Sequence, residues 1–278
     1  MLTHEIMGAL ALGILLVNGL LLIAAAYQEI AKLRALARVM KPLAHGRAGV
    51  GLVEAVIARG DGCRSIARHE IEQVGRSTDA GTIAFSDRAH KGELLGGSLA
   101  WGEGEESVSI DVPALSGAEI EIWVEQGARE RAAVCPSPEA FTAAFGDARR
   151  ARGYSRSVTV AMKEGDRVFV CGAIEESGEG LRAKPAPGGA LILSSFDPRS
   201  FLSAARLRVF GFIAFAAIAL GVCVAVCLWP PHFGTVSKIG AVLGIAYFLG
   251  VTPIGTAVRD SVRPPSRAFL RGRWDQPA

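Results

Sequence analysis

Four residues between positions 63 and 90 have side chains that can perform catalysis or bind a metal ion: Cys63, His69, Glu70 and His90. A cysteine beside a histidine can act as an activated nucleophile, and Cys and His together can coordinate zinc. The spacing matches no closed zinc site, however, and His69 falls in an alternating strand pattern. The sequence therefore favours an ordinary core or surface role for these residues and predicts no catalytic residue, no metal ligand and no cofactor.

Two further polar features have a possible chemical role. Glu103, Glu105 and Glu106 form an acidic cluster, which could bind Ca²⁺ but is favoured as a solvated loop. Asn18, inside an apolar run, could hydrogen-bond to another helix. The apolar runs contain no Asp, Glu, Lys or Arg, which argues against an ion-coupled transporter.

Three uncharged apolar runs dominate the elements around these residues, and they cover 6–27, 209–231 and 239–258. A bilayer core of about 30 Å requires about 20 apolar residues in a helix. The sequence therefore predicts a membrane protein with three transmembrane helices. The third run has the weakest signal because it contains four glycines and Pro253, although membrane helices tolerate both residue types.

The first run could instead be a cleaved signal peptide, because Ala24, Ala25 and Ala26 are typical of a cleavage site. No basic residue precedes the run, and its apolar stretch is longer than a typical signal sequence has. Basic residues follow the run instead. We therefore expect a membrane anchor.

Basic residues gather on one side of each run. Those expected at the cytoplasmic face are Lys32, Arg34, Arg38, Lys41, Arg206, Arg208, Arg259 and Arg263. The positive-inside rule then predicts an N-terminus outside the cell and a cytoplasmic soluble domain and C-terminal tail. The same residues predict contact with a lipid bilayer that has anionic headgroups, and no binding of nucleic acid, because they follow the membrane boundaries. The excess of Arg over Lys and the many Ala and Gly residues suggest a bacterial inner membrane.

The soluble part shows many short strand patterns separated by glycine-rich turns. The predicted strands are 49–58, 64–74, 81–86, 107–112, 118–124, 156–162, 167–176 and 190–194. One helix is predicted to follow the cap residue Ser137, and a second to begin at Pro198 and run to about residue 229. This pattern predicts a mainly β domain, a small barrel or sandwich, with one or two helices.

The predicted segments follow one another along the chain. They are a transmembrane helix over 1–27, a basic juxtamembrane helix over 28–43, a β domain over 44–197, a helix over 198–231 that continues into the second span, a third span over 239–258 and a basic tail over 259–278.

Several segments carry a resemblance to a known family. Gly51 to Glu54 follow the first span, and the stretch from Glu164 to Gly172 contains Gly165, Asp166 and Val168 at characteristic spacing. Together with 191–195 and 201–208, they resemble the GIDE domain family, also called BAM (beside a membrane). The family-motif residues are Gly51, Glu54, Gly165, Asp166, Val168 and Gly172.

The resemblance implies a β domain next to a membrane, but it does not imply ubiquitin ligase activity. The mitochondrial ligase of this family acts through a C-terminal RING, whose zinc ions need closely paired Cys and His ligands. The segment after Cys227 has only His232, and a third span occupies the RING position. The ligase domain also faces the intermembrane space, whereas the charge pattern here predicts a cytoplasmic domain.

Two functions are consistent with the sequence. The first is a non-enzymatic, membrane-anchored scaffold that recognises a protein partner or forms a homo-oligomer. The second is a membrane-associated effector of a stress or defence system with an unrecognised enzymatic activity. The sequence favours the first, because it contains no convincing catalytic group.

Overall fold

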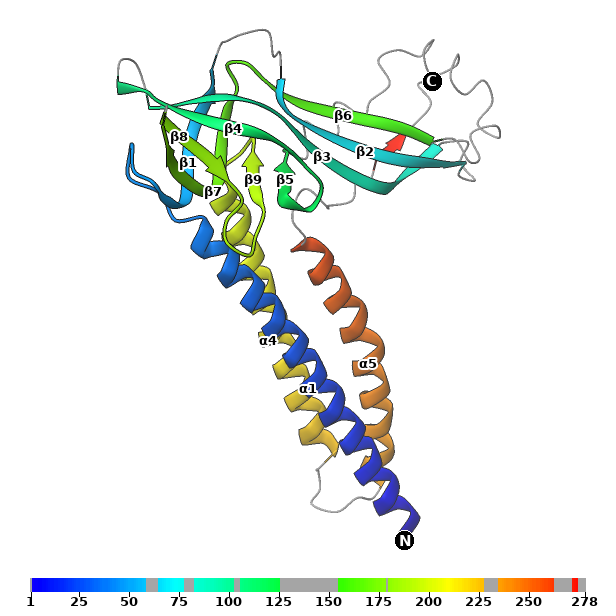
Figure 1. The fold of residues 1–278 in the computed structure, drawn as a ribbon. Coiled ribbons are helices and arrows are strands. Elements are labelled where there is room, and N and C mark those ends of the chain that lie inside the picture. The colour runs from blue at the N-terminus through cyan, green and yellow to red at the C-terminus, as the bar shows by residue number, and fades with distance from the viewer. Residues whose placement is uncertain are drawn as a thin grey trace. The chain divides into compact units, whose positions relative to one another are not determined.

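Among the described residues, three long helices cover most of the apolar runs (Figure 1). They are α1 (Leu2–Val39), α4 (Pro198–Cys227) and α5 (Thr235–Ser261). The computed structural model describes residues 2–58, 65–77, 83–102, 106–125, 155–178, 180–227, 235–262 and 272–274. The chain divides into a helical unit, residues 1–37 with 199–263, and a β unit, residues 38–198 with 264–278.

The helices of the helical unit pack through a small apolar core. Its buried members are Leu15, Phe212, Ala216, Cys223, Tyr247 and Val251. The Tyr247 hydroxyl donates a hydrogen bond to the Ala216 carbonyl oxygen, 3.3 Å away, which joins α5 to α4. α1 is continuous across the predicted anchor and juxtamembrane segments, and α4 begins at Pro198 as predicted.

Two helical stretches are long and apolar enough to cross a membrane, Leu12–Val39 and Pro198–Ala225. Three spans were predicted, so the described residues bear out two of them. α5 contains the whole of the third run and is helical, but it is the least apolar of the three helices because four glycines and Pro253 dilute its large side chains.

The described part of the β unit contains ten strands. They are β1 (Gly49–Ile57), β2 (Ser65–Ser77), β3 (Ile83–Trp101), β4 (Val108–Ser116), β5 (Ile120–Trp123), β6 (Ser155–Lys163), β7 (Arg167–Ser177), β8 (Gly180–Lys184), β9 (Leu191–Ser194) and β10 (Gly272–Trp274). A short 3-10 helix, η2 (Gly117–Glu119), connects β4 to β5.

Five strands close into a ring. β1 pairs with both β3 and β7, β3 pairs with β4, β4 pairs in parallel with β8, and β8 pairs with β7. Closure of this kind satisfies backbone groups that an open sheet would leave at its edges. Of the two predicted architectures, the ring corresponds to the small barrel. The first half of β3 extends beyond the ring and pairs with β2, which in turn pairs with β6.

The described part of the β unit has one large apolar core and a small separate cluster of Ile71 and Val158. The large core draws on nearly every strand, with Val53, Leu99, Ile110, Val168 and Ile174 among its most deeply buried side chains. Val168 and Val170 lie fully buried on β7, which corresponds to the strand predicted over 167–176.

The predicted strands all overlap strands of the structure, but their extents differ. The segment 81–86 covers only the beginning of β3, which continues to Trp101. β8 and β10 were not predicted. The helix predicted after Ser137 lies outside the described residues.

Candidate functional site

Two of the four residues singled out for chemistry lie together. His69 on β2 is opposite Gly92, and His90 on β3 is opposite Ile71, so both histidines lie on the same face of the paired strands. Their rings are stacked, with centroids 5.6 Å apart and planes at 28°. Glu70 lies on the other face, where its carboxylate accepts a hydrogen bond of 2.7 Å from the Ser157 hydroxyl. Cys63 lies outside the described residues.

The histidine pair does not form a metal site with the groups described around it. Within the described part of the chain, no three His, Cys, Asp or Glu side chains are placed to hold one ion. His69 is almost completely buried, in the same strand as the buried Ile71. Of the acidic cluster, Glu103 and Glu105 lie outside the described residues, and Glu106 offers its backbone carbonyl oxygen to the His45 ring, 3.0 Å away.

Cys171, on β7, is a poor nucleophile. Burial, and to a smaller extent the negative charge of Asp197, raises the pKa of its thiol from 9.0 to about 12. The reactive thiolate is therefore scarce at neutral pH.

We expect Cys171 to react with a thiol reagent only when the β unit opens. In a variant whose other cysteines are alanine, labelling at pH 8 should be about a thousandfold slower, or slower still, in buffer than in denaturing urea. Because the folded-state pKa is the higher one, this thiol stabilises the fold fully below pH 9.0, and its contribution is lost as the pH rises towards about 12. Native labelling at the rate of a free thiol would contradict this assignment.

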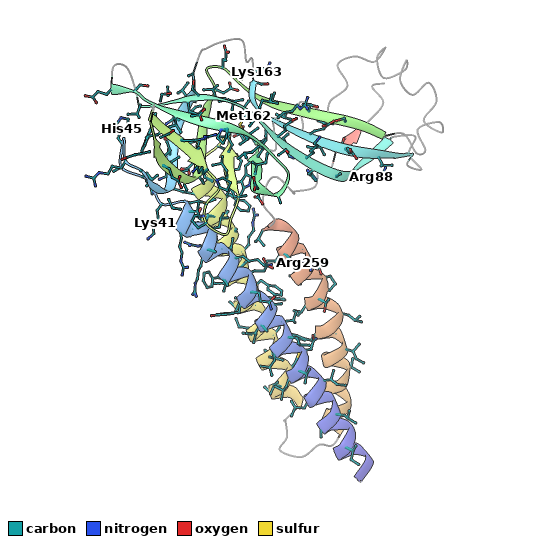
Figure 2. The ribbon with its side chains drawn as sticks, in the orientation of Figure 1. Lys41, His45, Arg88, Met162, Lys163 and Arg259 are labelled. Atoms are coloured by element: carbon teal, nitrogen blue, oxygen red, sulfur yellow. The ribbon has the colours of Figure 1, made fainter. Side chains whose placement is uncertain are left out.

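The flanking basic residues of the helical unit gather at one end of it. α1 and α4 run antiparallel, because Gly19 faces Leu220 whereas 30–34 lies beside 206–210. Lys32 and Arg34 of α1 therefore lie at the level of Arg206 of α4. Arg259 occupies the last turn of α5 (Figure 2). We call this the basic end. Arg263 lies outside the described residues.

Two cavities formed by described residues lie at the basic end. The larger, of about 390 Å³, is lined by all three helices, with Lys32 and Arg259 beside apolar groups such as Phe212. Glu29 also lines it, and its carboxylate lies 2.7 Å from the Lys32 ammonium. The smaller, of about 280 Å³, lies between α1 and α4. Its lining residues are Ile30, Leu33, Arg34, Arg206 and Phe210.

The sequence identified the two arginines of the smaller cavity and the helical spacing of Ile30 and Leu33, but it did not identify Phe210 as part of the same site. A usable signal is present, because Ile30 and Arg34, and likewise Arg206 and Phe210, are four residues apart and share a helix face. Which helix faces meet cannot be read from that spacing.

The family-motif residues have structural roles in the β unit. Gly51 and Gly172 lie directly opposite each other in the β1–β7 pairing. Gly165 adopts a positive φ of 83° in the turn between β6 and β7, and the Asp166 carboxylate accepts a hydrogen bond of 2.7 Å from the Lys163 backbone N–H. Glu54 forms an exposed ion pair with Arg167.

No protein-family model matches this chain, and no curated protein or solved structure is similar enough to count as a match. The resemblance to the GIDE family therefore stays a prediction, and the function must be argued from the geometry.

Proposed function

We propose that this protein is a non-enzymatic, membrane-anchored binding protein, in which the helical unit lies in a bilayer and the β unit is carried beside it. One observation carries the proposal. In each of the two long apolar helical stretches, only 17% of the most apolar 18-residue segment is buried inside the protein. A core helix of a soluble protein would be mostly covered by the rest of the molecule.

The exposed apolar surface belongs to the helices. Apart from Val50, Val56 and Leu95, every large hydrophobic side chain found exposed among the described residues lies on α1, α4 or α5. Soluble monomers rarely expose apolar patches larger than a few hundred Å². Lipid tails can cover such an apolar surface. The hydrogen bond from the Tyr247 hydroxyl to the Ala216 carbonyl oxygen joins two helices, as hydrogen bonds in membrane helix bundles do.

α1 is better explained as a permanent anchor than as a signal peptide. Its Leu15 side chain is buried in the apolar core that α4 and α5 also form. Cleavage after Ala26 would remove Leu15 and expose Phe212 and Tyr247. The first helix is thus an integral part of the helical unit.

A pairing in the β unit bears on the third span. β10, from the C-terminal tail, pairs antiparallel with the first residues of β3. The tail and the β domain must then lie on one side of the membrane, so an even number of spans separates them. If α4 crosses the bilayer, α5 must cross it too, and we propose three spans with the N-terminus on the opposite side.

The charge pattern supports a cytoplasmic β unit and tail in a bacterial inner membrane. The β unit is proposed to bind a protein partner, or a second copy of this chain. Its interior is an apolar core, and the buried His69 stacks on His90 on the face of the sheet opposite Glu70. This arrangement favours a binding domain of the GIDE type over an enzyme.

Cysteine labelling in intact bacterial cells tests this topology. The native cysteines are replaced by alanine, and single cysteines are introduced at exposed Glu164 and at Ala278. Neither should react with a membrane-impermeant reagent until the cells are permeabilised, whereas a cysteine at Thr3 should react at once. The chain should also stay in the membrane pellet after carbonate extraction.

The outcomes separate the parts of the proposal. Labelling at 164 but not at 278 would show that α5 does not span and that β10 does not pair with β3 in cells. Labelling at both would reverse the orientation. Release of the chain by carbonate would refute membrane insertion itself.

A further inference from the structure

The smaller cavity at the basic end is a groove with two arginines and no acidic residue in its lining. Arg34 and Arg206 come from different helices, and the other three lining residues, Ile30, Leu33 and Phe210, are apolar. Both arginines are exposed, and Phe210 is 53% exposed. The groove is therefore open and has both a cationic and an apolar part.

The antiparallel helices arrange these two parts in layers. On α1, Ile30 precedes Arg34 by one turn, and on α4, Arg206 precedes Phe210 by one turn. Because the helices run in opposite directions, both arginines lie at the level nearer the β-unit ends of the two helices. The apolar pair lies about 6 Å deeper along the helices, towards the centre of the apolar runs.

This layering matches the chemistry of a phospholipid. A guanidinium binds phosphate oxygens through two parallel hydrogen bonds, and two guanidiniums can clamp one phosphate. The deeper apolar layer suits the beginning of an acyl chain. A soluble anion would use the arginines but leave Phe210 and Ile30 without a role.

The groove differs in charge from the larger cavity. There, Glu29 lies 2.7 Å from the Lys32 ammonium and would oppose an added anion. The lining of the groove has no carboxylate that could meet the choline or ethanolamine of a zwitterionic lipid. The charge pattern thus favours a headgroup with a net negative charge.

We propose that this groove binds one anionic phospholipid of the phosphatidylglycerol type. The phosphate lies between Arg34 and Arg206, and one acyl chain lies along Ile30, Leu33 and Phe210. The inference rests on the proposed membrane insertion and adds a specific lipid site to it. A bound lipid of this kind would join α1 to α4.

The test uses the full-length protein in detergent, with bound lipids counted by native mass spectrometry during titration. Phosphatidylglycerol should bind about tenfold more tightly than phosphatidylcholine. The double variant Arg34→Gln/Arg206→Gln should lose about tenfold in affinity for phosphatidylglycerol and lose the preference. Phe210→Ala should weaken both lipids, because it removes an acyl contact.

The matched control is Lys32→Gln/Arg208→Gln, which removes two positive charges from the same two helices outside the groove. It should change phosphatidylglycerol binding by about twofold or less. An equal loss in this control would show that general charge, not the groove, attracts the lipid, and would overturn the proposal. Equal affinity for the two lipids in the wild-type protein would do the same.

Glycerol 3-phosphate distinguishes a lipid site from a free-anion site. It should not displace phosphatidylglycerol at millimolar concentration. If it does, and if Phe210→Ala has no effect, the groove binds a soluble phosphate and the lipid proposal is wrong. Carbonate extraction of each variant distinguishes the lipid site from membrane insertion. A chain that stays in the membrane but shows no lipid preference refutes the lipid site and leaves membrane insertion standing.

Discussion

Val168→Asp is expected to unfold the β unit. The side chain of Val168 is fully buried on β7, within the apolar core of the ring. An aspartate there would bury an unpaired charge and also remove apolar contacts. The expected loss in the free energy of unfolding is about 4 kcal/mol or more, a large part of the total stability of an ordinary domain. Val170→Asp should have the same effect for the same reason.

Tryptophan fluorescence of the full-length protein in detergent measures this loss. Trp123 is completely buried in the β unit, so its emission should shift to the red in the variant without denaturant. Val56→Asp is the matched control. Val56 is 41% exposed on β1, and its partner in register is Arg167, so the same substitution should cost about 0.5 kcal/mol or less. A folded, soluble Val168→Asp protein with native fluorescence would show that the β7 assignment is wrong.

Local patterns were sufficient to predict much of the fold. The strand predicted over 167–176 corresponds to β7, and the turn at 164–166 lies between β6 and β7 as predicted. A short apolar run and a Gly–Asp turn are signals that neighbouring residues carry by themselves. The apolar runs 6–27 and 209–231 likewise predict α1 and most of α4 from composition and length.

β3 was predicted only in part because its glycines disrupt the strand pattern in the sequence. Gly92, Gly96 and Gly97 interrupt the apolar alternation, and glycine generally weakens strands. In the structure, the φ of Gly97 is +153°, and a Cβ added at Gly97 would lie 2.7 Å from the Ile66 side chain. Tertiary packing of β2 against β3 therefore requires glycine at a position where local preference argues against a strand.

Long-range pairings could not be predicted from local patterns. β1 closes the ring by pairing with β7, which lies more than a hundred positions later in the chain. The local sequence of neither strand indicates which strand it pairs with. The same limit applies to the groove at the basic end. The charge of Arg34 and Arg206 was a visible signal of a membrane boundary, but their meeting beside Phe210 depends on the packing of α1 against α4.

The motif glycines of the β unit show what a sequence motif can encode. Gly51 and Gly172 face each other across β1 and β7, and neither has a positive φ. A Cβ at Gly51 would lie 2.5 Å from the Lys41 carbonyl oxygen, and a Cβ at Gly172 would lie 2.6 Å from the Lys184 carbonyl oxygen. Both positions thus need glycine because another stretch of backbone passes directly above them.

Gly172→Ala and Gly51→Ala should each lower the free energy of unfolding by about 3 kcal/mol, as overpacking against backbone does. The two variants should differ in what they disturb. Gly172→Ala displaces the end of β8, so it should destabilise the ring as a whole. Gly51→Ala displaces the segment after α1, whose Lys41 carbonyl oxygen accepts a 2.8 Å hydrogen bond from the Leu52 N–H, and so should also speed cleavage by trypsin after Lys41.

Gly178→Ala is the control for both variants, because no atom lies within 4 Å of a Cβ at Gly178 and its φ is not positive. It should leave the stability unchanged within about 0.5 kcal/mol, or raise it slightly by restricting the unfolded chain. Urea unfolding, followed by tryptophan fluorescence, compares the three proteins directly. If Gly172→Ala and Gly51→Ala unfold at the same urea concentration as Gly178→Ala, the close approach of Lys41 and Lys184 to the ring is wrong. The motif would then need a reason other than space.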